Sequence, residues 1–161
     1  MLASCALDGR TGHEAGRALL ARLYGEATGQ PLPPIVIGEW GKPEFVDSEW
    51  HFSISHTKNH AFCVLAKENV AIDAEELGRR VNLSLAEKIL SPSEKDQFDA
   101  AADKTRALLM FWVMKEAAAK LSGRGLRGYP KDTAFSLDDP RIREQDGCLI
   151  AIFTEGETYA V

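Results

Sequence analysis

The middle of the chain carries two consecutive apolar runs that any fold of this sequence must accommodate. Residues 61–66 and 70–74 are mostly apolar, and the polar residues 67–69 separate them. Two such runs about a polar break predict a pair of strands. Before them, residues 12–28 have apolar side chains at helical spacing and are followed by Gly29, as in a helix with a glycine stop. Strands and helices are thus expected in one chain, and the predicted fold class is α+β.

Other segments extend this pattern. Residues 35–37 predict a short strand before a loop rich in Gly and Pro. Residues 49–56 alternate, so a half-buried strand would carry Trp50, Phe52 and Ile54 on one face and Ser53 and Ser55 on the other.

The second half of the sequence continues with helical and then strand patterns. The helical pattern resumes at residues 84–90, and Ser91, Pro92 and Glu94 have the spacing of a capping box at the start of a further helix. A long helix follows around Trp112. Residues 133–161 predict strands joined by turns at 144–147 and 155–156. No repeat or linker is visible, so residues 1–161 are expected to form a single domain.

Size and charge restrict the classes of partner. A chain of 161 residues with 45% hydrophobic content can build a substantial core. The net charge of −5 gives no general case for binding nucleic acid. An anion-binding site would have to be a local cluster of basic side chains, because the average field of the protein repels anions.

The cysteines and the apolar segments bear on location. Cys5, Cys63 and Cys148 are widely spaced and form no CxxC pair, which favours the reducing cytoplasm over a disulfide framework or a zinc site. Residues 2–5 resemble a lipoprotein cleavage box, but almost nothing precedes Cys5 where a secretion signal needs an apolar run. No run of about 20 apolar residues occurs, so no membrane span is expected.

The long helix carries an unusual stripe. Trp112, Glu116 and Lys120 are spaced by four residues and therefore lie along one helix face. A carboxylate and an amine on such a stripe suit a functional site. The alternative is a solvated face with one Glu–Lys pair, which stabilises a helix by only about 0.2–0.5 kcal/mol. This segment alone does not decide between the two.

Two carboxylates follow the apolar run at residues 70–72. In a strand, Asp73 and Glu75 point to the same side, opposite to Val70, Ile72 and Ala74. Neighbouring carboxylates repel unless a cation lies between them. Mg2+ prefers oxygen ligands and often binds through one or two carboxylates together with substrate phosphates. The alternative is a strand end that runs into solvent.

The Ser55–His56 pair does not indicate a hydrolase. Adjacent strand residues point to opposite faces, so they cannot act on each other as nucleophile and base. The sequence also lacks a GxSxG elbow. The spacing of His51, His56 and His60 matches no zinc pattern, and His51 and His60 are interpreted as polar loop residues.

Five motifs occur in an order that resembles one family. They are GKP at 41–43, FSISH at 52–56, AIDAE at 71–75, LSPSE at 90–94 and FWVMKEAAAKLSGRGL at 111–126. In this order and spacing the chain is similar to 4'-phosphopantetheinyl transferases of the surfactin-synthetase-activating type, which carry GKP, FNxSH, GxDxE, FSxxE and WxxKExxxK–GxGL motifs. Ala71 and Ser53 replace the usual Gly and Asn, both small changes.

The resemblance implies a fold and an activity. The fold would consist of two similar halves, roughly 1–67 and 68–161, each a helix on a small antiparallel sheet, with the first half abbreviated. Coenzyme A would bind in the cleft between them. The enzyme would transfer 4'-phosphopantetheine from coenzyme A, with Mg2+, to a serine of an acyl or peptidyl carrier protein of fatty acid, polyketide or nonribosomal peptide biosynthesis.

The resemblance also implies roles for individual residues. The metal ligands would be Asp73, Glu75 and Glu116, with Asp73, Glu116 and Lys120 as the catalytic set. Lys120 would contact the pyrophosphate of coenzyme A. Further contacts to the coenzyme are expected from Lys42, Ser55 and His56. Glu94 occupies the acidic FSxxE position, although its capping box already accounts for it.

The N-terminal portion departs from the family. Only about 40 residues precede the GKP motif, and typical members have a longer portion that supplies basic residues for the 3'-phosphate of coenzyme A. Arg10, His13 and Arg17 are the available substitutes. The start codon lies further upstream, or the chain is a compact variant, or coenzyme binding is weakened.

Two alternatives to the transferase remain open. One is a paralogue that binds coenzyme A or a carrier protein without turnover, which the abbreviated first half favours. The other is a trimeric, short-type holo-acyl-carrier-protein synthase. The position of Asp73 after a full helix-and-sheet half argues against this second class.

Overall fold

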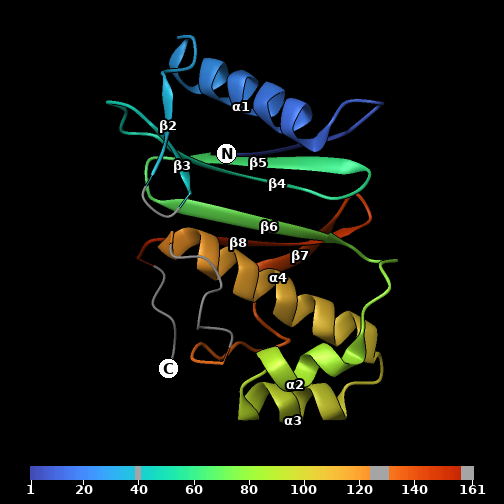
Figure 1. Ribbon diagram of the computed structural model, residues 1–161. Coiled ribbons are helices and arrows are strands. Elements are labelled where there is room, and N and C mark those ends of the chain that lie inside the picture. Colours follow the sequence, from blue (N-terminus) through green and yellow to red (C-terminus); the bar gives the residue numbers. More distant parts are fainter. Residues whose placement is uncertain (39–40, 124–130, 157–161) are drawn as a thin grey trace.

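The structure, a computed structural model, describes residues 1–38, 41–123 and 131–156. The elements follow one another in the order β1 (Leu2–Ala6), α1 (Gly12–Thr28), β2 (Ile35–Ile37), β3 (Pro43–Phe45), β4 (His51–His56), β5 (His60–Ala66), β6 (Val70–Glu76), η1 (Leu83–Leu85), α2 (Ala86–Ile89), α3 (Pro92–Ala100), α4 (Lys104–Ser122), β7 (Ile142–Gln145) and β8 (Cys148–Thr154). Figure 1 shows α1, two sheets and α4 stacked as layers, with α2 and α3 beyond α4. The expected α+β class is confirmed.

The first half consists of α1 on the antiparallel sheet β1-β5-β4. Thr11 caps the start of α1 and Gly29, at φ 69°, ends it, as the glycine stop predicted. The buried face of α1 packs against the side chains of β5 and β4 that point toward it. That apolar face includes Ala15, Leu19, Leu20 and Leu23. The β2–β3 ribbon lies beside this sheet (Figure 1).

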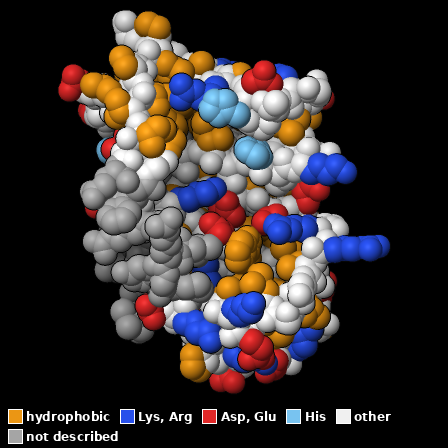
Figure 2. Space-filling view, viewed as in Figure 1, with side chains coloured by type: hydrophobic (Ala, Val, Ile, Leu, Met, Phe, Trp, Pro, Cys, Tyr) orange, Lys and Arg blue, Asp and Glu red, His pale blue; other side chains and the backbone are white. Residues whose placement is uncertain are grey.

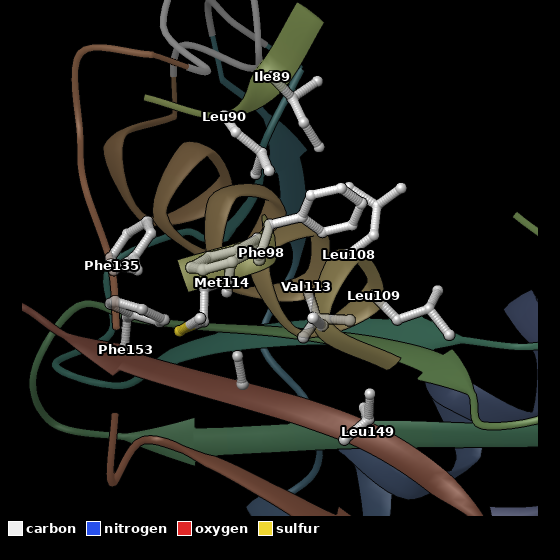
Figure 3. Close-up of a cluster of buried hydrophobic side chains, with 14 of the residues drawn as sticks. Ile89, Leu90, Phe98, Leu108, Leu109, Val113, Met114, Phe135, Leu149 and Phe153 are labelled. Carbon is white, nitrogen blue, oxygen red and sulfur yellow. The ribbon is translucent and has the colours of Figure 1, made fainter. Parts of the chain in front are cut away.

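The second half consists of α4 on the antiparallel sheet β6-β8-β7. Asp146 and Gly147 both have positive φ, 52° and 71°, which gives the tight two-residue turn between β7 and β8. The core between α4, the sheet and the helices α2 and α3 is shown in Figure 3. Its labelled side chains are Ile89, Leu90, Phe98, Leu108, Leu109, Val113, Met114, Phe135, Leu149 and Phe153.

The two sheets pack against each other through a third apolar cluster. Phe62 and Val64 of β5 belong to this cluster together with Ile72 of β6 and Ile150 of β8. Both predicted strands form, as β5 and β6, but they do not pair with each other, since β5 pairs with β1 and β4 while β6 pairs with β8. Residues 67–69 carry the chain from one sheet to the other, which buries both faces of β5.

Two further local differences have physical reasons, and one strand was not predicted. Residues 133–137 form no strand, because the Phe135 N–H donates to the buried Glu94 carboxylate instead of to a neighbouring strand. The helical pattern at 84–90 yields only η1 and the single turn α2, since the residue before Pro92 has to be extended. Residues 2–5, considered above only as a cleavage box, lie in the edge strand β1.

The capping box at Ser91 is confirmed, with Glu94 bonded back to the Ser91 N–H at 2.8 Å. Among the described helices, none is long and apolar enough to cross a membrane.

Candidate active site

The site lies where β4, β6 and α4 meet. Asp73 is buried on the face of β6 that points toward α4, opposite to Ile72 in the inter-sheet cluster. Its carboxylate accepts hydrogen bonds from the Ser55 hydroxyl at 3.0 Å and from Lys120 Nζ at 2.7 Å. Strand β4 and helix α4 thus both contact the same carboxylate, and the predicted facing of Asp73 is confirmed.

The stripe on α4 points into the same place. Trp112, Glu116 and Lys120 all line one cavity of about 370 Å³. Burial of the carboxyl group is the first cause that raises the pKa of Glu116, and the negative charge of Asp73 raises it further. The Lys120 ammonium opposes this rise, and Glu75 adds to it. The face is therefore a charged site, and the alternative of a solvated surface with one ion pair does not describe it.

The remaining walls of this cavity come from β4 and from the end of β6. His56 and Glu75 line it, and so does Arg79, which forms an ion pair with Glu75. Figure 2 shows acidic, basic and histidine side chains gathered across the middle of one face of the molecule. Arg79 has no counterpart in the motifs of the sequence analysis, and its spacing of four residues from Glu75 is the only local signal.

A second cavity of about 250 Å³ adjoins the first. It is lined by the GKP loop, by β4 and by the C-terminal end of α4, and it shares Ile54 and Lys120 with the first cavity. Lys120 therefore stands between the two spaces. The two cavities together extend from Lys42 at one end to His56 at the other. The GxGL segment of the motif after Gly123 lies outside the described residues.

Lys42 is held in place by an asparagine that sequence reasoning missed. Its Nζ donates to Asn69 Oδ1 at 2.5 Å, and Asn69 Nδ2 donates to the carbonyl oxygen of Leu121 at 3.2 Å. Burial lowers the pKa of Lys42, against the attraction of Glu44 and Glu155. Asn69 thus ties the GKP lysine to the end of α4, a contact across 27 residues that no local pattern announces.

Arg10 and His13 are not brought to either of these two cavities. The Arg10 guanidinium donates to the carbonyl oxygens of Leu7 at 3.1 Å and Ala6 at 3.0 Å. His13 is exposed on the first turn of α1. The start of α1 also carries its own carboxylate, because Glu14 accepts from the Thr11 N–H at 2.8 Å. A role of Arg10 and His13 in coenzyme binding stays a prediction.

The carboxylates suit a hard cation by their chemistry. Asp73, Glu75 and Glu116 offer oxygen donors to one cavity, and such donors are those that Mg2+ takes. Within the described parts of the chain, no three acidic, His or Cys side chains already lie close enough to enclose a metal ion. Lys120 and Arg79 instead form ion pairs with Asp73 and Glu75, so a cation would replace these ion pairs.

Comparison with known proteins gives a consistent result. The family model described as the 4'-phosphopantetheinyl transferase superfamily matches residues 69–160. The chain is 36% identical over 115 residues to the 4'-phosphopantetheinyl transferase AcpT of Escherichia coli O157:H7, covering 68% of this chain and 56% of that protein. It is 31% identical over 102 residues to the 4'-phosphopantetheinyl transferase gsp of Aneurinibacillus migulanus, covering 62% and 41%. The chain spans about half the length of the curated relatives it matches.

Proposed function

Because this chain belongs to the 4'-phosphopantetheinyl transferase superfamily, we propose that it transfers 4'-phosphopantetheine from coenzyme A to a serine of an acyl or peptidyl carrier protein. The observation that carries the proposal is the position of Lys120, between the two cavities and 2.7 Å from Asp73. The Lys120 ammonium group at this junction would face the pyrophosphate of a coenzyme that occupies both cavities.

The coenzyme would occupy both cavities, and different residues would bind it in each. Lys42 would contact coenzyme phosphates in the smaller cavity, and His56 would do so at the far wall of the larger one. Lys120 would meet the pyrophosphate as a point charge, the manner in which lysine binds phosphate. The Ser55 hydroxyl lies at the same junction and is held by Asp73.

The transfer is an in-line displacement at phosphorus. The carrier-protein serine oxygen forms a bond to the β-phosphorus of coenzyme A, the bond from that phosphorus to the bridging oxygen breaks, and 3',5'-ADP leaves. Asp73, Glu75 and Glu116 would hold Mg2+, which when bound neutralises pyrophosphate charge. Lys120 and His56 would stabilise the negative charge that develops on the leaving group.

The serine proton requires an acceptor. Glu116 is the candidate, directly or through a water molecule, because its carboxylate lines the cavity next to Asp73 and Lys120. The Asp73 carboxylate is less suited, since it already accepts hydrogen bonds from Ser55 and Lys120.

Two observations bear on the location of the protein and on the class of the enzyme. The thiols of Cys5, Cys63 and Cys148 are free, which supports the reducing cytoplasm. The cleft between the α1 half and the α4 half lies within one chain, which supports the two-half enzyme over a trimeric synthase.

Mass spectrometry tests the proposed activity. A panel of apo acyl and peptidyl carrier proteins would be incubated with the protein, coenzyme A and Mg2+. We expect at least one carrier to gain the mass of phosphopantetheine on its serine, and the gain to be lost with Asp73→Asn. Binding of coenzyme A without modification of any carrier would favour the non-catalytic paralogue.

A further inference from the structure

His56 packs directly on the first turn of α1. Gly12 is the first residue of α1. A Cβ atom built on Gly12 would lie 2.3 Å from Cγ, 2.6 Å from Nδ1 and 2.7 Å from Cδ2 of His56. Three ring atoms are therefore closer than any real Cβ contact allows. The imidazole occupies the space that a side chain at position 12 would need.

The backbone of α1 does not itself require a glycine here. Gly12 lies in the helix without a positive φ, so other residues can adopt its conformation. The capping contacts of this turn come from Thr11 and Glu14. Position 12 therefore needs a glycine because of the neighbouring His56 ring, and not because of the helix backbone.

Other glycines of α1 provide internal comparisons. A Cβ on Gly16 would lie 2.4 Å from Ile54 Cγ2, whereas a Cβ on Gly25 would have no atom within 4 Å. Gly12 and Gly16 therefore form the face on which α1 closely approaches β4. Both neighbours line the larger cavity, but Ile54 is apolar, whereas the His56 ring beside Gly12 is polar.

We infer that Gly12 is a positioning residue that sets the His56 imidazole against the cavity of Asp73 and Glu116. This inference rests on the proposed function, in which His56 contacts a coenzyme phosphate. His56 stands at the exposed end of β4, and the first turn of α1 forms a wall on one side of its ring. The cavity also borders this ring, so the imidazole stands between the first turn of α1 and the cavity.

A methyl group at position 12 should displace the ring and leave the fold intact. The ring would have to retreat by about 1 Å to reach ordinary contact, and a displacement of this size at a binding group can reduce activity up to about a hundredfold. Because His56 is exposed, it can yield without opening the core. Alanine also favours a helix over glycine, so stability should not fall.

The matched experiment compares Gly12→Ala with Gly25→Ala. Both variants make the same chemical change in the same helix, and only the first meets a neighbour. We expect Gly12→Ala to weaken the binding of coenzyme A with Mg2+ about tenfold by isothermal titration, and Gly25→Ala to leave it unchanged. The ring signals of His56 in a nuclear magnetic resonance spectrum should move in Gly12→Ala alone. The two variants should have equal thermal stability.

His56→Ala completes the test as a double-mutant cycle. In the His56→Ala background, Gly12→Ala should have no further effect on coenzyme binding. Normal binding by Gly12→Ala, or an equal loss with and without His56, would overturn the inference while the proposed function stands. Normal binding by His56→Ala would instead show that His56 makes no phosphate contact. The inference would then fail too, even if the His56 ring signals move in Gly12→Ala.

Discussion

Helix α4 carries two lysine–carboxylate pairs that differ in their surroundings. Lys115 pairs with Glu94 at 2.8 Å, and their side chains are 3% and 0% exposed. Lys120 pairs with Asp73 at 2.7 Å, and their side chains are 34% and 10% exposed. The two pairs have nearly equal distances, so distance alone does not separate them.

The difference lies in what else each pair contacts. Glu94 also accepts from the N–H groups of Ser91 and Phe135, and Lys115 also donates to the Thr133 carbonyl oxygen. These contacts tie α3, α4 and the 133–135 segment together. The Lys120 pair instead stands at the junction of two cavities. The first pair is a closed structural contact, and the second is open to a ligand.

The largest expected effect separates the two pairs by activity. Asp73→Asn and Glu116→Ala should each reduce carrier modification by more than about a hundredfold. Mutating even the outer-shell partners of metal ligands reduces metal affinity or activity by about 10–100-fold, and these two residues are proposed as ligands themselves. Circular dichroism should show an unchanged fold, and coenzyme binding should lose its dependence on Mg2+. Near-normal turnover in either variant would make the metal assignment wrong.

The buried pair should respond in stability instead. Lys115→Met leaves the Glu94 charge buried without its partner, and breaking such a pair costs about 3–5 kcal/mol of unfolding free energy. Adding Glu94→Gln removes that charge and should recover part of the loss. Urea unfolding measures both, and activity per folded molecule serves as the control. An unchanged urea midpoint in Lys115→Met would mean that this pair does not hold the second half together.

Sequence reasoning found the features with local signals. The caps at Gly29 and Ser91, the alternating faces of β4 and β6 and the stripe on α4 all follow from spacing within one element. The Glu94–Lys115 pair, the Asn69 contact with Lys42 and the separation of β5 from β6 into two sheets depend on contacts between distant segments. Such contacts are decided by packing of the whole core, and the sequence shows them only where a family resemblance supplies the order of motifs.

A smaller effect is expected at the open lysine. Lys120→Ala removes a charged hydrogen bond in a partly exposed site, worth about 1.5–3 kcal/mol, so kcat/KM for coenzyme A should fall roughly ten- to hundredfold. Lys120→Arg should recover only part, because its fork does not match a point-charge site. Steady-state kinetics with the apo form of a carrier protein that the wild type modifies gives the numbers. If Lys120→Ala left kcat/KM unchanged, the pair with Asp73 would be as purely structural as the buried one.

The smallest effect concerns the start of α1, where basic residues would replace the longer N-terminal portion of the family. A compact variant should prefer coenzyme A over 3'-dephospho-coenzyme A, and this preference should shrink as salt rises, because exposed charges are screened. Arg17→Ala should reduce the preference a few-fold, in the range of about 0–1 kcal/mol for exposed charge pairs. Arg10→Ala should reduce it less, since the Arg10 guanidinium already donates to the carbonyl oxygens of Leu7 and Ala6. Isothermal titration of both ligands against the wild type and the two variants measures this order, and equal affinity of the wild type for both ligands would show that α1 provides no site for the 3'-phosphate.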